Sequence, residues 1–286
     1  MSWSRLSLRS GALAYLAFLI VIPVGSVFYR AFQHGFATAW DAITTTAALH
    51  ALWLTLLVVA IAVPLDTVFG VGVALILARH RFRGAWLLDA LVDIPLALSP
   101  VVVGLSLVLV YGHTGWFGGW LGTHHITIIY AVPAIVMASA AVSLPYVVRE
   151  VLPVLQEIGT EQEQAARTLG AGPLTVFRRI TLPSIQRGLA YGMTLTTARV
   201  LGEFGAVAIV SGAILGRTQT LTLFISSSID NLDPVGAYTG AVILALIALA
   251  VLGLLGVVGP REGRTRWLSR SPESPSDSDP LSLSTG

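Results

Sequence analysis

The chain contains no cysteine and no lysine, and it carries little charge of either sign. Without cysteine, disulfides, thiolate metal sites and a cysteine nucleophile are excluded. Without lysine, the chain has neither the P-loop lysine that binds nucleotide phosphates nor the amine of a Schiff-base enzyme. Because all 17 basic residues are arginine, we expect that this chain does not act as a conventional ATPase by itself.

The low charge content also predicts where the chain resides. Charged residues make up 11% of the 286 residues and apolar residues 55%, against about 25% and about 45–50% in an ordinary soluble domain. Because this number of charges is too small to cover a protein of this size with a hydrated shell, we expect most of the surface to face lipid. The formal net charge of +2 comes without a dense basic patch, and nucleic acid is therefore not an expected partner.

Six stretches of the sequence are long and apolar enough to cross a bilayer as helices. They comprise residues 11–33, 51–78, 87–111, 126–148, 187–212 and 235–258. We predict an all-α polytopic membrane protein with a six-helix transmembrane domain over 11–260. A cytoplasmic N-terminus over 1–10 and a disordered cytoplasmic tail over 261–286, rich in serine and proline, would flank it.

The arginines predict the orientation of these spans. If the six spans alternate in direction, 14 of the 17 arginines lie on one side of the membrane, two lie on the other, and Arg199 lies inside the fifth span. Arginine-rich short loops stay in the cytoplasm. We therefore expect both termini and the 149–187 loop in the cytoplasm, and the loops 112–125 and 213–234 outside.

The long cytoplasmic loop is predicted to contain two short helices. Thr160 followed by Glu163 has the pattern of a capping box, and Gly170 suits the left-handed residue that ends a helix. Pro173 fits the first turn of a second helix, which Pro183 is expected to end.

The second of these helices would present an apolar ridge. Leu174, Phe177 and Ile180 recur every three residues, beside Arg178 and Arg179. The residues leave two interpretations open: a docking surface for a partner protein, or arginines that only enforce the topology.

The spacing in this loop resembles a known motif. Ala165 and Ala166 are followed after three residues by Gly170, and after nine more by Ile180 and then Pro183. This pattern resembles the EAA motif of permease subunits of bacterial ABC importers, a loop that inserts a coupling helix into a cleft of the ATP-binding subunit. The ATPase-docking and coupling residues that the resemblance implies are Gln164, Ala165, Ala166, Gly170, Leu174, Phe177, Arg178, Ile180 and Pro183.

The resemblance extends over nearly all of residues 10–260. Residues 198–207 read ARVLGEFGAV, similar to the ARxxGEFGA signature of permeases for sulfate, thiosulfate, molybdate and tungstate. Residues 93–102 and 115–118 are most similar to the W-type permease of the sulfate importer. The chain departs from the motif at Gln164, where the family has glutamate.

The resemblance implies a type I ABC permease, one half of a two-permease pore in the bacterial inner membrane. It would import an oxyanion, foremost sulfate or thiosulfate, with molybdate or tungstate as the alternative and a secondary anion carrier as a more distant one. The implied partners are an ABC ATP-binding subunit, a second permease that is a T-type sister or a second copy, an extracytoplasmic sulfate-binding protein and membrane lipid. No catalytic residue, cofactor or metal is expected, and the sequence contains neither GxSxG nor HExxH.

A translocation path or gate is predicted from two places within the spans. Arg199 and Glu203 lie four residues apart, on one face with Thr196, and because a lone charge at mid-bilayer costs about 2.5–3.5 kcal/mol, we expect them to pair. Arg199 would either fix packing or the gate, or contact the anion. Ser99 and Pro100 would interrupt the third span, which either frees backbone N–H groups for an anion or only kinks the helix.

Overall fold

The computed structural model describes residue 11 and residues 14–258 of the chain. Every regular element within these residues is a helix, which confirms the predicted all-α class. The predicted N-terminus 1–10 and tail 261–286 lie outside the described residues.

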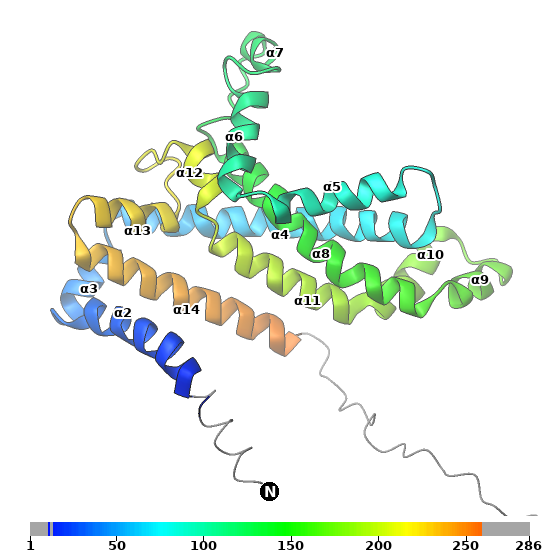
Figure 1. Ribbon diagram of the computed structural model, residues 1–286, viewed down its shortest axis with the longest axis horizontal. Coiled ribbons are helices and arrows are strands. Elements are labelled where there is room, and N and C mark those ends of the chain that lie inside the picture. The colour runs from blue at the N-terminus through cyan, green and yellow to red at the C-terminus, as the bar shows by residue number, and fades with distance from the viewer. Residues whose placement is uncertain (1–10, 12–13, 259–286) are drawn as a thin grey trace, which may run out of the picture.

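Four helices of the described part are long and apolar enough to cross a membrane. The first, Ala14–Phe32, includes η1 (Ala17–Val21) and α2 (Ile22–Phe32). The others are α4 (Thr46–Arg79), α8 (Val132–Ile158) and α14 (Pro234–Val258). They correspond to the predicted spans one, two, four and six, and Figure 1 shows them running lengthwise along the molecule.

The third and fifth spans are broken. The interruption of the third span at Ser99 and Pro100 is as predicted, whereas the break in the fifth span after Leu201 was not expected. The helices α5 (Ala85–Ala97) and α6 (Pro100–Tyr111) meet at 113°, and the helix that ends with α11 (Leu182–Leu201) meets α12 (Gly205–Ser211) at 54°. If each bent pair counts as one span, the described residues contain up to six spans.

Local chemistry explains the first of these breaks. Ser99 has an extended backbone, with φ −61° and ψ 137°. The ring of Pro100 disfavours a helical conformation in the residue before it. The helix α6 therefore starts in a new direction, and Figure 1 shows it standing away from the bundle with α7 (Gly118–Thr123) at its tip.

The remaining helices are short. They are α3 (Phe36–Ile43), α9 (Glu161–Thr168), α10 (Pro173–Val176), η2 (Phe177–Thr181) and α13 (Leu221–Asp230). The helix α13 lies in the predicted 213–234 loop and was not expected. It packs back against α4, where the amide of Leu221 donates a hydrogen bond of 2.8 Å to Oγ1 of Thr55.

The core lies where α4, α8 and α11 pack together. Glycine allows the close approach of these helices: a Cβ on Gly70 of α4 would lie 2.7 Å from Cβ of Val147, and one on Gly188 of α11 would lie 2.6 Å from the carbonyl oxygen of Glu150. Small residues are typical of helix contacts in membranes, because packing rather than hydrophobicity holds helices together in lipid.

An ion network ties α5 to α8. The guanidinium of Arg149 lies 2.8 Å from a carboxylate oxygen of Asp89 and 2.6 Å from one of Asp93. All three side chains are partly exposed.

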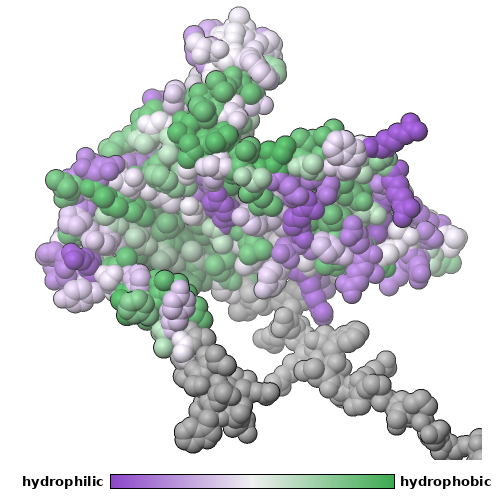
Figure 2. Space-filling model, viewed as in Figure 1, coloured by the Kyte–Doolittle hydropathy of each residue, from purple (hydrophilic) through white to green (hydrophobic). Residues whose placement is uncertain are grey.

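The surface divides into apolar and polar regions. Figure 2 shows hydrophobic residues over α6 and along α5, and hydrophilic residues gathered at the end where α9 and α10 lie in Figure 1. Large apolar side chains are exposed even in the middle of α4, where Val68 and Phe69 are 69% and 62% exposed. Such a surface is expected of a protein that faces lipid.

Candidate functional site

The end of α9 has the geometry that the sequence predicts. Gly170 has a φ of +83°; its amide donates to the carbonyl of Arg167, and the amide of Ala171 donates to that of Ala166, both at 3.0 Å. These two bonds form a Schellman motif. A Cβ on Gly170 would meet no atom within 4 Å, so the position requires the backbone freedom of glycine rather than its small size.

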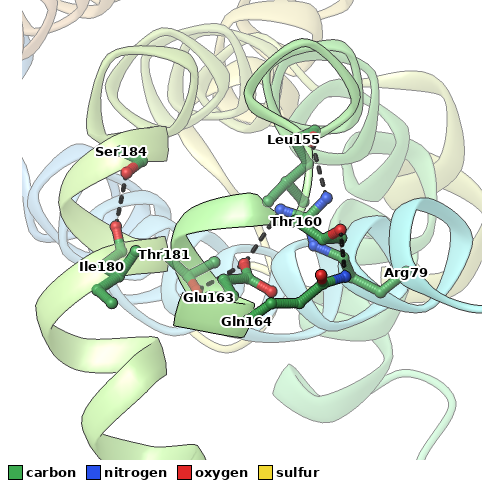
Figure 3. Close-up of polar contacts among 8 residues, drawn as sticks. All are labelled: Arg79, Leu155, Thr160, Glu163, Gln164, Ile180, Thr181 and Ser184. Atoms are coloured by element: carbon green, nitrogen blue, oxygen red, sulfur yellow. Dashed lines mark hydrogen bonds and ion pairs between the residues drawn. The ribbon is translucent and has the colours of Figure 1, made fainter. Parts of the chain in front are cut away.

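The start of α9 differs from the prediction, because the capping box at Thr160 and Glu163 does not form. The side chain of Thr160 makes no capping bond and instead accepts a hydrogen bond of 2.9 Å from Nε2 of Gln164. The carboxylate of Glu163 points into the bundle, away from the start of its own helix (Figure 3). Stronger donors from other helices hold it there.

Glu163 and its donors belong to a buried group of four residues, which we call the Arg79 cluster. It consists of Arg79, Leu155, Glu163 and Thr181. Arg79 donates to Oε1 of Glu163 at 3.0 Å and to the carbonyl oxygen of Leu155 at 2.9 Å. The hydroxyl of Thr181 donates to the same carboxylate oxygen at 2.9 Å. The side chains of Arg79 and Glu163 are only 12% and 10% exposed. In the sequence, Arg79 was one of the 14 arginines that predict the orientation of the spans, and this contact was not expected.

The second loop helix does not end at Pro183, so that prediction is wrong. The chain continues from α10 through η2 into α11, and Pro183 occupies the first turn of α11. The amide of Leu182 donates to the carbonyl of Phe177, the five-residue step of a π-helix. Proline lacks an N–H and clashes with the preceding turn of a regular α-helix. The wider π turn lets the helix continue.

The residues of the predicted apolar ridge do not share one face: one points to solvent and the others point toward the bundle. Leu174 is 68% exposed, whereas Phe177 packs against the core between α4 and α8 and Ile180 is half-buried. The π-helical turn changes the angle between successive residues, so a spacing of three no longer marks one face. Leu169, at 89% exposure, is an apolar side chain of this region that the sequence did not single out.

Most of the residues predicted to dock the ATP-binding subunit are exposed, and we call the exposed ones that precede Pro183, together with Leu169, the docking face. It consists of Gln164, Ala165, Leu169, Gly170, Leu174 and Arg178. Ala166 is half-buried beneath it. The docking face lies at the hydrophilic end of the molecule (Figure 2).

The predicted ion pair of the fifth span is confirmed. Nη1 of Arg199 lies 2.7 Å from Oε2 of Glu203, with the two side chains 27% and 2% exposed. Glu203 is not in a helix, however. It lies in the break before α12, where Oε1 accepts a hydrogen bond of 2.9 Å from the amide of Ala206 and its carbonyl accepts one from Thr222. The carboxylate therefore caps α12 and pairs with α11.

The break also changes the environment of Thr196. This residue is fully buried within the chain, and because α11 ends at Leu201, Glu203 no longer lies on one helix face with it as the spacing predicted. A cavity of about 10 Å³ lies beside Glu203 and is lined in part by Thr55 and Ser139. That volume is about the size of one water molecule.

The two broken spans lie against each other at their breaks. A Cβ on Gly205, the first residue of α12, would lie 3.2 Å from Cβ of Pro100, the first residue of α6. The amides of Val102 and Val103 both donate to the carbonyl of Ser99, at 2.9 and 3.2 Å. These bonds reduce the number of free amides that the interruption offers an anion.

A comparison with protein families decides the class of this chain. Residues 70–264 match the family described as binding-protein-dependent transport system inner membrane component. The chain belongs to this family. It is the membrane component of such a transport system, and it has the type I ABC permease fold that the sequence predicts.

Individual members of this family are similar along most of the chain. The chain is 47% identical to a sulfate transport system permease protein CysW of Synechocystis sp. over 88% of its own length and 91% of that protein. It is 41% identical to the protein of the same name from Escherichia coli, over 88% and 87%. It is 37% identical to the Escherichia coli sulfate transport system permease protein CysT, over 88% and 91%.

Solved structures agree with the fold. A chain from the crystal structure of a bacterial alginate ABC transporter, in complex with an alginate-bound periplasmic protein, matches this permease with a TM-score of 0.74. The match covers 90% of this chain and 93% of that chain, at 15% identity. At that identity the likeness concerns the fold alone.

Proposed function

We propose that this family member is the permease subunit of an ATP-driven importer that carries sulfate or thiosulfate into the cytoplasm. The observation that carries this proposal is the 41–47% identity, over 88–91% of the chain, to permeases named for sulfate transport. The chain would not hydrolyse ATP itself, because it has no P-loop lysine. A separate ATP-binding subunit would supply the energy.

The docking face is proposed as the contact with that subunit. Leu169 and Leu174 expose apolar side chains in the loop at the hydrophilic end of the molecule, and this loop also carries the exposed Arg178. An exposed apolar pair with a neighbouring cation suits an interface with another protein. This assignment places the 149–187 loop and both termini in the cytoplasm, as the arginine distribution predicts.

The junction of the two broken spans is proposed as part of the translocation path or its gate. Ser99 and Pro100 lie at one break and Glu203 at the other, with Arg199 and Thr196 on the adjoining turns of α11. Helix breaks next to each other provide places where helices can turn relative to one another. The pore would be completed by a second permease, a T-type sister or a second copy, and supplied by an extracytoplasmic sulfate-binding protein.

The decisive experiment is uptake of radiolabelled sulfate. The permease would be expressed in a bacterial strain that lacks its own W-type permease but keeps the binding protein, the sister permease and the ATP-binding subunit. We expect sulfate uptake and growth on sulfate as the sulfur source to be restored. If the chain inserts into the membrane but supports uptake of molybdate and not of sulfate, the proposed substrate is wrong, while the family assignment remains valid.

A further inference from the structure

The helix that carries the docking face is attached to the bundle in an unusual way. Among the eight residues of α9, all of them described, the one buried residue is Glu163, a charged residue. Helices are ordinarily held on a protein by an apolar stripe. Because the largest apolar contribution of α9 is the half-buried methyl group of Ala166, we infer that the polar contacts of Glu163 are the main attachment of α9 to the bundle.

One carboxylate oxygen of Glu163 accepts from Arg79 and from Thr181, and Arg79 extends the network to a third helix. Arg79 is the last residue of α4, and it also binds the carbonyl of Leu155 in α8. Thr181 belongs to the π turn that leads directly into α11. Figure 3 shows the side chains of Arg79 and Thr181 converging on Glu163 between these helices. A movement of α4, α8 or α11 at this end therefore acts on α9 through Glu163.

The cluster is also largely shielded from solvent, because the side chains of Arg79 and Glu163 are only 12% and 10% exposed. A cavity of only about 10 Å³ adjoins Arg79 and Glu163, room for about one water molecule. Within the described residues, Nε of Arg79 is buried without a hydrogen-bond partner. Charge-assisted hydrogen bonds in such an environment are stronger and more directional than exposed ones.

We propose that Arg79 is a positioning residue that couples the transmembrane bundle to the ATPase-docking helix through Glu163. This inference rests on the proposed function, in which the docking face binds the ATP-binding subunit. The side chain of Arg79 is only 12% exposed, so we assign it no contact with that subunit. Its role is to make α9 move together with α4 and α8, so that ATP hydrolysis is converted into rearrangement of the pore.

The test uses the complete transporter, purified through a tag on the permease and reconstituted in lipid vesicles with the binding protein. In Arg79→Gln we expect the ATP-binding subunit to co-purify as in wild type. We expect ATP hydrolysis to continue, while the number of ATP molecules hydrolysed per sulfate imported rises about five- to tenfold, near the lower end of the effects that typical coupling free energies produce. Arg81→Gln, at an exposed arginine of the same segment, is the matched control and should keep the wild-type ratio.

A second variant protects the test against misfolding. Arg79→Gln leaves a buried carboxylate without its cation, which can prevent folding. The double variant Arg79→Gln with Glu163→Gln removes both charges, while glutamine at 163 can still accept from Thr181. We expect it to assemble and to show the same rise in ATP consumed per sulfate.

Because the chain has no native cysteine, introduced cysteines can be cross-linked selectively. This permits a rescue experiment that distinguishes coupling from a merely structural role. The pair Arg79→Cys and Glu163→Cys should be uncoupled like the double glutamine variant. Joining the two thiols with a short bifunctional thiol reagent should restore the wild-type ratio, because a covalent link replaces the ion pair. The cysteine-free wild-type permease treated with the same reagent reports any effect on the other subunits.

Two results would overturn the inference. One is a wild-type ratio in an assembled Arg79→Gln or double glutamine complex, and the other is failure of the cross-link to restore coupling. Neither result contradicts the proposed function if the wild-type transporter imports sulfate with sulfate-stimulated ATP hydrolysis. If wild type itself neither binds the ATP-binding subunit nor imports sulfate, the proposed function fails first.

Discussion

The carboxylate of Glu203 joins two helices: Oε1 accepts the amide of Ala206 at 2.9 Å, and Oε2 lies 2.7 Å from Nη1 of Arg199. The first contact caps α12 and the second pairs with the last turn of α11. Only the second depends on charge, because a glutamine oxygen can accept the same amide. Neutral and truncating substitutions of Glu203 should therefore differ.

Arg199→Gln should lower the amount of permease in the membrane, because it leaves a buried carboxylate unpaired at a cost of roughly 3–5 kcal/mol. Adding Glu203→Gln should restore much of the abundance, measured by immunoblot of membranes, since the cap on Ala206 is kept. Adding Glu203→Ala instead should restore less, because capping is lost at a cost of about 0.5–2 kcal/mol.

Sulfate uptake by the double glutamine variant then separates the two roles of Arg199. We expect partly recovered uptake, as a structural pair requires. An abundant but inactive variant would assign Arg199 to contact with the anion, because no change at Glu203 returns the positive charge. Wild-type abundance and uptake in Arg199→Gln alone would contradict both roles.

Gly170→Ala and Gly170→Val should impair docking without removing the protein from the membrane. At a φ of +83° a side chain costs about 1–2 kcal/mol even where space is free, and valine costs more because it is β-branched. We expect reduced co-purification of the ATP-binding subunit and reduced sulfate-stimulated ATP hydrolysis. Gly172→Ala is the matched control, because Gly172 has a φ of −70° and open space around its Cβ. Full transport by Gly170→Val would show that this loop is not the coupling element.

Gly70→Ala should destabilise the bundle, whereas Gly72→Ala, two residues along the same helix, should not. An added Cβ at Gly70 would lie 2.7 Å from Cβ of Val147 in α8, while one at Gly72 meets nothing within 4 Å. Overpacking of this kind costs about 1–3 kcal/mol. Thermal unfolding in detergent should show a lower midpoint for Gly70→Ala alone. Equal midpoints would mean that α4 and α8 can separate without cost.

Single cysteines should report the orientation of the chain. Thr123 and Asn231 are exposed at the ends predicted to face outward, and cysteines there should react with an impermeant thiol reagent in intact cells. Cysteines at Arg81 or Thr175 should react only after permeabilisation. Gly118 is unsuitable, because a Cβ there would lie 2.2 Å from the carbonyl oxygen of His113. The reverse labelling pattern would refute the orientation predicted from arginine.

Hydropathy and local chemistry were sufficient for much of the fold. Four of the six apolar stretches are single helices long enough to cross a membrane, and the end of α9 at Gly170 and the start of α10 at Pro173 are confirmed. Each depends on residues close together in the chain: a run of apolar side chains needs lipid, glycine alone enters the left-handed region at no cost, and proline suits a first helical turn.

Tertiary structure decided the features that depend on distant neighbours. Glu163 fits a capping box by spacing, yet it binds Arg79, 84 residues away in sequence, because a buried carboxylate gains more from a cation than from a local amide. The apolar ridge through Leu174 and Phe177 divides because the chain adopts a π turn before Pro183. Local sequence sets which conformations are possible, and packing between helices selects the one that satisfies every buried charge and proline at once.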